Sequence, residues 1–260
     1  MSGNVRKRVD RAIGWIEFDN AEKRNAMSLQ MFEELFTAMD ELSRASDVRV
    51  IALRGAGTRA FVSGADISEF DALRSVPEQI RRYDDIAERA YARLREIEKP
   101  TVAMINGYCI GGGMAIALEC DLRICSHDAQ FAIPAARLGL GYRESGVRKL
   151  VEMVGPTAAK EIFFTAGRYS ADEMLALGLV NRVVQKSEIE KFATEYCDAI
   201  ARNAPLTIAA AKKAVNAALS DPRKTSEAVD ACINACFASE DYKEGRRAFL
   251  EKRSPIFRGF

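Results

Sequence analysis

The chain has 260 residues, 48% of them hydrophobic, which is enough for one large core. Its 38 lysines and arginines balance 37 aspartates and glutamates, so the formal net charge is +1. Basic and acidic residues are interleaved, which excludes the charge pattern of a nucleic-acid or acidic-membrane partner. No apolar run is long enough to cross a bilayer, and the first ten residues lead into strand-like sequence rather than a signal segment. We therefore expect a cytoplasmic globular protein.

Strands and helices alternate over the first 185 residues. Residues 11–19 alternate weakly and predict a strand, and Ser28 stands where it can cap a helix with apolar residues at three- and four-residue spacing. The apolar runs 48–56 and 101–110 each predict one buried strand. Shorter strands are predicted at residues 122–126, 130–134 and 179–184. This alternation predicts an α/β fold.

The remainder of the chain is helical in pattern. The stretch SADE, residues 170–173, is a capping box that opens a helix, and Gly178 ends that helix. Further helices are predicted at residues 187–203, 206–219 and 224–241 and in the stretch that runs to Leu250. We predict a core of residues 1–186 that holds the active site. Residues 187–260 form a helical region that packs on this core or on a neighbouring subunit.

The six cysteines lack the spacing of a disulfide framework, and several lie in apolar stretches. Buried, reduced thiols are the expected state. Cys232 and Cys236 share a helix face, but the single histidine, His127, is far from them in sequence. No metal site is expected.

Glycines mark two places where backbone N–H groups are exposed. Gly64 and Ala65 follow a predicted strand, and Gly112 stands at the start of an apolar helix. The first N–H groups of a helix lack partners and carry partial positive charge, which suits an anionic oxygen. Two such donors that converge on one point would form an oxyanion hole.

The motifs SGADI (63–67) and NGYCIGGGMAIALECDLRI (106–124) resemble the signature of the crotonase (enoyl-CoA hydratase/isomerase) superfamily. The resemblance covers almost the whole chain. It implies a crotonase-like spiral of ββα units with a C-terminal helical trimerisation region, assembled as a homotrimer or a dimer of trimers. It also implies an acyl-CoA thioester as substrate, no cofactor beyond coenzyme A, and an oxyanion hole made by the N–H groups of Ala65 and Gly112.

Two positions depart from the pattern of the hydratases in this superfamily. These enzymes carry one glutamate two residues after the third glycine and another after the proline that corresponds to Pro134. Here those positions are Ala115 and Ala135. Hydration needs a base to activate water and an acid to protonate the α-carbon, and alanine can do neither.

The stretch LGLGYRESG, residues 138–146, offers replacements. The methylmalonyl-CoA decarboxylase branch of the superfamily has a tyrosine at the position of Tyr142, although it has histidine where this chain has Ala65. Loss of CO₂ generates an enolate without proton abstraction, so an oxyanion hole plus the Tyr142 hydroxyl would suffice. Alternatively, Glu144 is a relocated base, or Arg143 pairs with a substrate carboxylate.

The resemblance also implies contacts to coenzyme A. These map to Lys23 and Arg24, to the backbone around Asp66 and Ile67, and to Lys252 and Arg253 near the C-terminus. Ser68 stands where many hydratases have a lysine.

Our leading hypothesis is an acyl-CoA lyase that stabilises a thioester enolate and decarboxylates a malonyl-type thioester. Two alternatives stay open. One is an enoyl-CoA hydratase or isomerase whose acid/base is Glu144, and the other is a non-catalytic acyl-CoA-binding protein.

Overall fold

The computed structural model describes residues 3–73, 75–220 and 226–260. Its larger sheet has six strands in the order β1-β2-β3-β5-β7-β10. These are β1 Asn4–Asp10, β2 Ile13–Asp19, β3 Val50–Gly55, β5 Thr101–Ile105, β7 Leu122–Ser126 and β10 Arg182–Val184. Only the β1–β2 pair is antiparallel. The α/β fold predicted from the alternation is confirmed.

A second sheet has four short strands in the order β4-β6-β8-β9. They are β4 Ala60–Val62, β6 Tyr108–Ile110, β8 Gln130–Ala132 and β9 Tyr169–Ser170. The prediction of one strand over 101–110 is wrong: the chain leaves the first sheet after β5, turns at Asn106 and Gly107, and enters the second sheet as β6. Both halves of that stretch are buried, so its hydropathy does not reveal the change of sheet.

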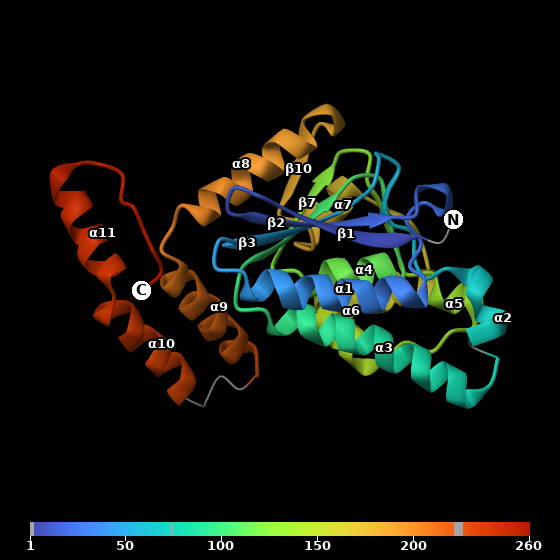
Figure 1. Cartoon of the computed structure of the whole chain (residues 1–260). Helices are drawn as coiled ribbons and strands as arrows, with labels where there is room; N and C mark the ends of the chain where they lie inside the picture. The colour runs from blue at the N-terminus through green and yellow to red at the C-terminus, as the bar shows by residue number, and fades with distance from the viewer. Residues whose placement is uncertain (1–2, 74, 221–225) are drawn as a thin grey trace.

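Helices cover the sheets and connect their strands (Figure 1). In the core they are α1 Leu29–Arg44, α2 Phe70–Leu73, α3 Pro77–Glu96, α4 Gly112–Glu119, α5 Ala135–Leu138, α6 Glu144–Thr165 and α7 Ala171–Ala176, with short 3₁₀ turns at Ala21–Lys23, Ile67–Glu69 and Lys186–Glu188. The predicted cap of α1 is confirmed, since the Ser28 hydroxyl accepts a hydrogen bond from the Met31 N–H at 3.2 Å. The capping box at Ser170 and Glu173 is also present. Helix α3 packs along α1 and against α4.

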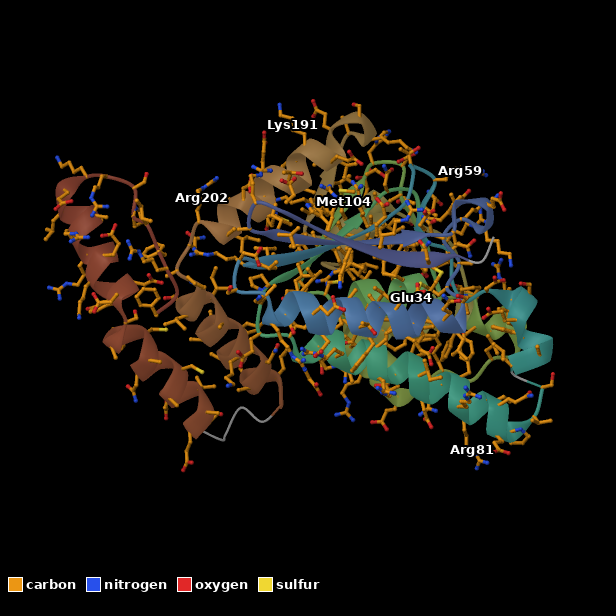
Figure 2. The ribbon with its side chains drawn as sticks, in the orientation of Figure 1. Glu34, Arg59, Arg81, Met104, Lys191 and Arg202 are labelled. Atoms are coloured by element: carbon orange, nitrogen blue, oxygen red, sulfur yellow. The ribbon has the colours of Figure 1, made fainter. Side chains whose placement is uncertain are left out.

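The C-terminal part of the chain consists of α8 Ile189–Ala201, α9 Pro205–Ser220, α10 Glu227–Ala238 and α11 Glu240–Glu251. Residues 224–225 of the predicted third tail helix lie outside the described residues. Helix α8 lies on the large sheet, where Ile189, Ala193 and Cys197 bury their side chains with Met104 (Figure 2). Helices α9–α11 extend away from the sheets (Figure 1), and they expose large apolar side chains such as Phe249, which is 83% exposed.

None of the helices in the described ranges is both long and apolar enough to cross a membrane. Among the same residues, no three histidine, cysteine, aspartate or glutamate side chains gather where they could hold a metal ion.

The burial of four thiols leads to a prediction about their reactivity. Burial raises the pKa of Cys120, Cys125 and Cys197 to about 12 and that of Cys109 well above its usual value. Because the thiolate is the reactive form, we expect a thiol reagent at pH 8 to label only the partly exposed Cys232 and Cys236 in the folded protein. All six cysteines should react after denaturation. Rapid labelling of more than two thiols in the folded protein would contradict this burial.

Candidate active site

The loop after β4 leaves one backbone donor unused. The N–H of Met27 donates to the Gly64 carbonyl and the N–H of Asp66 donates to the Met27 carbonyl, both at 2.8 Å. The N–H of Ala65 between them has no acceptor in the part of the chain that the structure describes. Gly64 makes this turn possible, since its φ of +112° disfavours any residue with a Cβ.

Helix α4 begins beside this loop. A Cβ built on Gly112 would lie 3.7 Å from the Ala65 nitrogen, and the Gly112 N–H, at the first position of α4, has no intrahelical acceptor. Gly113 allows this close approach, because a Cβ there would lie 2.2 Å from the Val62 carbonyl oxygen. The two N–H groups thus flank one small volume, which is the geometry of an oxyanion hole.

A cavity opens from these two donors. Its lining includes Ala65, Gly112, Ala115, Ala135 and Tyr142, together with side chains of α3 and the start of α6. Ala115 and Ala135, the positions where hydratases carry glutamates, contribute buried methyl groups to the wall. Neither can hold or move a proton.

Tyr142 lies at the wall of the cavity in the loop between α5 and α6. Its ring packs edge-on against Phe163, with the ring centroids 5.1 Å apart. Burial raises the pKa of Tyr142 to about 12, so the hydroxyl keeps its proton at neutral pH. No protein group among the described residues hydrogen-bonds to this hydroxyl. It is therefore free to donate to a ligand.

The other two candidates from the same loop differ in position. The Glu144 side chain is 83% exposed, pairs with Arg148 at 2.5 Å and does not belong to the cavity lining. Arg143 does line the cavity, where its guanidinium lies 3.4 Å from the Asp84 carboxylate. The structure places Tyr142 and Arg143 in the same cavity lining as Ala65 and Gly112 and leaves Glu144 in solvent.

The candidates for coenzyme A contacts separate into two groups. The Lys23 amine donates to the Asp66 carboxylate at 2.7 Å and to the Ser68 hydroxyl at 2.8 Å. Burial raises the pKa of Asp66, but the hydrogen bonds from Lys23 and Ser68 outweigh it and hold the pKa below the usual value. Ile67 is 61% exposed and lines the cavity rim, and the Arg24 guanidinium lies over the Tyr108 ring.

Lys252 and Arg253 lie elsewhere. They follow α11, which Figure 1 places at the opposite end of the molecule from α2 and α5 beside the cavity. Arg253 is bound to the Glu244 carboxylate at 2.6 and 2.9 Å. Within one chain, these two residues do not reach the predicted coenzyme A site.

Residues 8–259 match the family described as enoyl-CoA hydratase/isomerase. The chain belongs to this family. It is therefore a crotonase-superfamily enzyme that acts on acyl-CoA thioesters, and the resemblance inferred from the SGADI and GGGMA motifs is confirmed at this level.

Relatives of known structure and name agree on the fold and divide on the reaction. The chain is 34% identical to the short-chain-enoyl-CoA hydratase of Clostridium acetobutylicum, over 96% of this chain and 95% of that one. It is 33% identical to the methylmalonyl-CoA decarboxylase of Escherichia coli, over 94% of each. A crystal structure of an enoyl-CoA hydratase/carnithine racemase from Magnetospirillum magneticum superposes with a TM-score of 0.93, with 34% identity over 97% of this chain and 94% of that one. The predicted crotonase fold is confirmed, whereas the decarboxylase branch is one of several at similar identity.

This crotonase carries a polar cluster in its cavity that the sequence analysis missed. Both oxygens of Glu119 accept from the Arg95 guanidinium, at 2.7 and 2.9 Å, and the Glu119 side chain is only 4% exposed. Glu88 accepts from the Ser145 hydroxyl at 3.1 Å and lies 3.6 Å from Arg95. Glu119 stands one helical turn after Ala115, and that i,i+4 spacing was the available sequence signal.

The ion pair between Glu119 and Arg95 joins α4 to α3, so its loss should destabilise the protein. Arg95 is 39% exposed, which reduces the worth of the pair through solvent screening. We expect Glu119→Gln to lower the free energy of unfolding by about 1–3 kcal/mol, because the buried side chain at position 119 loses its ion pair and one of its two charge-assisted hydrogen bonds with Arg95. The control is Glu41→Gln, which removes an exposed partner of Lys7 and should change stability by less than about 0.5 kcal/mol. Equal effects of both substitutions in urea unfolding would show that the Glu119 pair contributes nothing special.

Proposed function

We propose that this crotonase decarboxylates a malonyl-type CoA thioester through an enolate held by the N–H groups of Ala65 and Gly112. The observation that carries the proposal is the pair of methyl groups at Ala115 and Ala135, with the unpartnered Tyr142 hydroxyl beside them. Cleavage of the carbon–carbon bond leaves its electron pair on the α-carbon, so no base is needed. The oxyanion donors stabilise that charge as it moves to the thioester oxygen.

Tyr142 has the role of orienting the departing carboxylate. A carboxylate perpendicular to the thioester plane releases its electrons directly into the carbonyl system. A neutral phenol that keeps its proton is a suitable donor to such a group, and burial of the ring keeps it neutral. Arg143 provides a nearby positive charge, although it is already engaged with Asp84.

Hydration of an enoyl-CoA is the second candidate, and two observations favour it. The Clostridium relative is named a hydratase, and Glu88 and Glu119 supply carboxylates to the cavity lining. The version with Glu144 as the base loses support, because that side chain points into solvent. The third hypothesis, a non-catalytic acyl-CoA-binding protein, would use the same hole and cavity without turnover, and membership of a family of enzymes speaks against it.

Coenzyme A would lie along Lys23, Arg24, Asp66 and Ile67 at the rim of the cavity. Lys252 and Arg253 would contact it only from a neighbouring copy, which agrees with a homotrimer or a dimer of trimers. The exposed apolar side chains of α9–α11 are suited to such an interface.

The reaction itself is tested by incubating the protein with methylmalonyl-CoA and, separately, with crotonyl-CoA. We expect CO₂ and propionyl-CoA from the first substrate. With crotonyl-CoA we expect a rate about two to four orders of magnitude below that of a two-glutamate hydratase, since acid/base groups contribute that much. Mass spectrometry of the products distinguishes the outcomes. Rapid hydration without CO₂ release makes the chain a hydratase, and binding without turnover of either substrate makes it a binding protein.

Replacement of Tyr142 by phenylalanine keeps the ring and removes one donor to a charged group. Such a hydrogen bond is worth about 1.5–3 kcal/mol, so decarboxylation should fall about ten- to a hundredfold. Affinity for propionyl-CoA, which has no carboxylate, and thermal stability should hardly change. Glu144→Gln serves as the control and should leave the rate unchanged, because that carboxylate lies outside the cavity. An unaltered rate in Tyr142→Phe would reduce Tyr142 to a packing residue.

A further inference from the structure

A second phenol reaches the oxyanion hole from α3. Asp84, Ala87, Glu88 and Tyr91 follow one another at helical spacing on this helix and all line the cavity. The Tyr91 hydroxyl lies 3.6 Å from the position of a Cβ on Gly112, and the Ala65 nitrogen lies 3.7 Å from the same position. Tyr91 thus stands beside both oxyanion donors.

The Tyr91 hydroxyl has no partner of its own. Within the part of the chain that the structure describes, no protein group hydrogen-bonds to it. The ring is held edge-on against Phe32, with centroids 5.7 Å apart. One turn later on α3, the Arg95 guanidinium donates two hydrogen bonds to the Glu119 carboxylate of α4. These contacts fix the phenol relative to the first turn of α4, so its free hydroxyl is positioned rather than solvated.

We propose that Tyr91 is a catalytic residue and that its hydroxyl donates the proton to the α-carbon of the thioester enolate. This inference rests on the enolate of the proposed function. A thioester oxygen bound to the N–H groups of Ala65 and Gly112 has its α-carbon about 2.4 Å away, across two bonds. The Tyr91 hydroxyl lies beside the same donors, so a proton transfer to this carbon is within its reach.

The step balances with water as the final source of the proton. The bond between the α-carbon and the carboxylate breaks, CO₂ leaves, and the electron pair passes through the α-carbon to the thioester oxygen. The enolate then takes the proton of the Tyr91 O–H at its α-carbon, and the carbonyl re-forms. The phenolate that remains takes a proton from water, which leaves hydroxide.

The carboxylates that line this part of the cavity are engaged. Both oxygens of Glu119 are bound by Arg95, Glu88 accepts from Ser145, and Asp84 faces Arg143. Tyr142 is assigned to the carboxylate that departs. Burial raises the pKa of Tyr91 well above its usual value, with added effects from Tyr142, Tyr83, Glu88 and Glu119. The phenol therefore carries its proton at neutral pH and is a donor, not a base.

The test follows deuterium from solvent into the product. Methylmalonyl-CoA is decarboxylated in D₂O by the full chain, and the configuration of the deuterated α-carbon of propionyl-CoA is determined. The parent should deliver deuterium to one face. In Tyr91→Phe, water replaces the positioned acid, so the ratio of the two configurations should fall from above about ten to near one, and product formation should fall about tenfold or more.

Crotonyl-CoA in D₂O provides the same readout if the proposed decarboxylation fails. Hydration also delivers hydrogen to the α-carbon, so Tyr91 is tested whichever reaction forms the enolate. A single configuration retained in Tyr91→Phe with either substrate overturns the assignment. If methylmalonyl-CoA gives no CO₂ while crotonyl-CoA gives a deuterated hydration product, the decarboxylase proposal is overturned and the Tyr91 assignment is tested on hydration. Absence of turnover of both substrates by the parent overturns both proposals.

Tyr196→Phe is the matched control. Tyr196 lies on α8, stacked on Phe192 against the large sheet and outside the cavity lining. This substitution removes the same hydroxyl from a partly buried ring, and it should leave both the rate and the configuration of the product unchanged. Thermal unfolding of Tyr91→Phe is measured beside it. A loss of configuration with unchanged stability assigns the effect to the hydroxyl and not to packing.

Discussion

Two backbone N–H groups beside one small volume are the constraint on which the centre of the molecule depends. The N–H groups of Ala65 and Gly112 have no protein acceptor among the described residues, so both can donate to a ligand oxygen. Short-range contacts hold the two groups in place. Gly64 turns the loop after β4, and Gly113 lets α4 approach Val62 closely. In the proposed function, the thioester oxygen of the substrate accepts from both groups.

The second constraint is the position of α3 over α4. The pair between Arg95 and Glu119 joins the two helices at one end, and the ring contact between Phe32 and Tyr91 ties α3 to α1. The cavity between them consequently has a wall that does not depend on its occupant. The carboxylates of Asp84, Glu88 and Glu119 have partners, whereas the hydroxyls of Tyr91 and Tyr142 have none among the described residues. Together with the N–H groups of Ala65 and Gly112, these hydroxyls are donors suited to negative charge that develops on a substrate.

Features that depend on a few neighbouring residues, such as helix caps and glycine turns, can be predicted from the sequence. The cap at Ser28, the capping box at Ser170 and the oxyanion glycines depend on a few neighbouring residues, and all three are present. The break between β5 and β6 was missed because burial on both sides makes the two strands one apolar run. The sequence does not predict the part of the cavity wall that contains Tyr91 and Glu119. These residues come to one cavity only when α3 and α4, which are separate in sequence, pack together. Glu144 was considered because it neighbours Tyr142, yet α6 begins there and turns the side chain outward.

The distribution of protons in the cavity bears on the choice of reaction. A hydratase needs a group that accepts a proton from water, and phenols whose pKa lies well above neutrality do not accept one. Each oxygen of Glu119 already accepts a hydrogen bond from Arg95, so this carboxylate is committed in part to joining α3 to α4. Decarboxylation needs no general base, because the electron pair comes from the carbon–carbon bond that breaks as CO₂ leaves. The enolate then needs only a proton donor. Alanine at positions 115 and 135, together with the protonated phenols of Tyr91 and Tyr142, therefore favours the proposed decarboxylation over hydration.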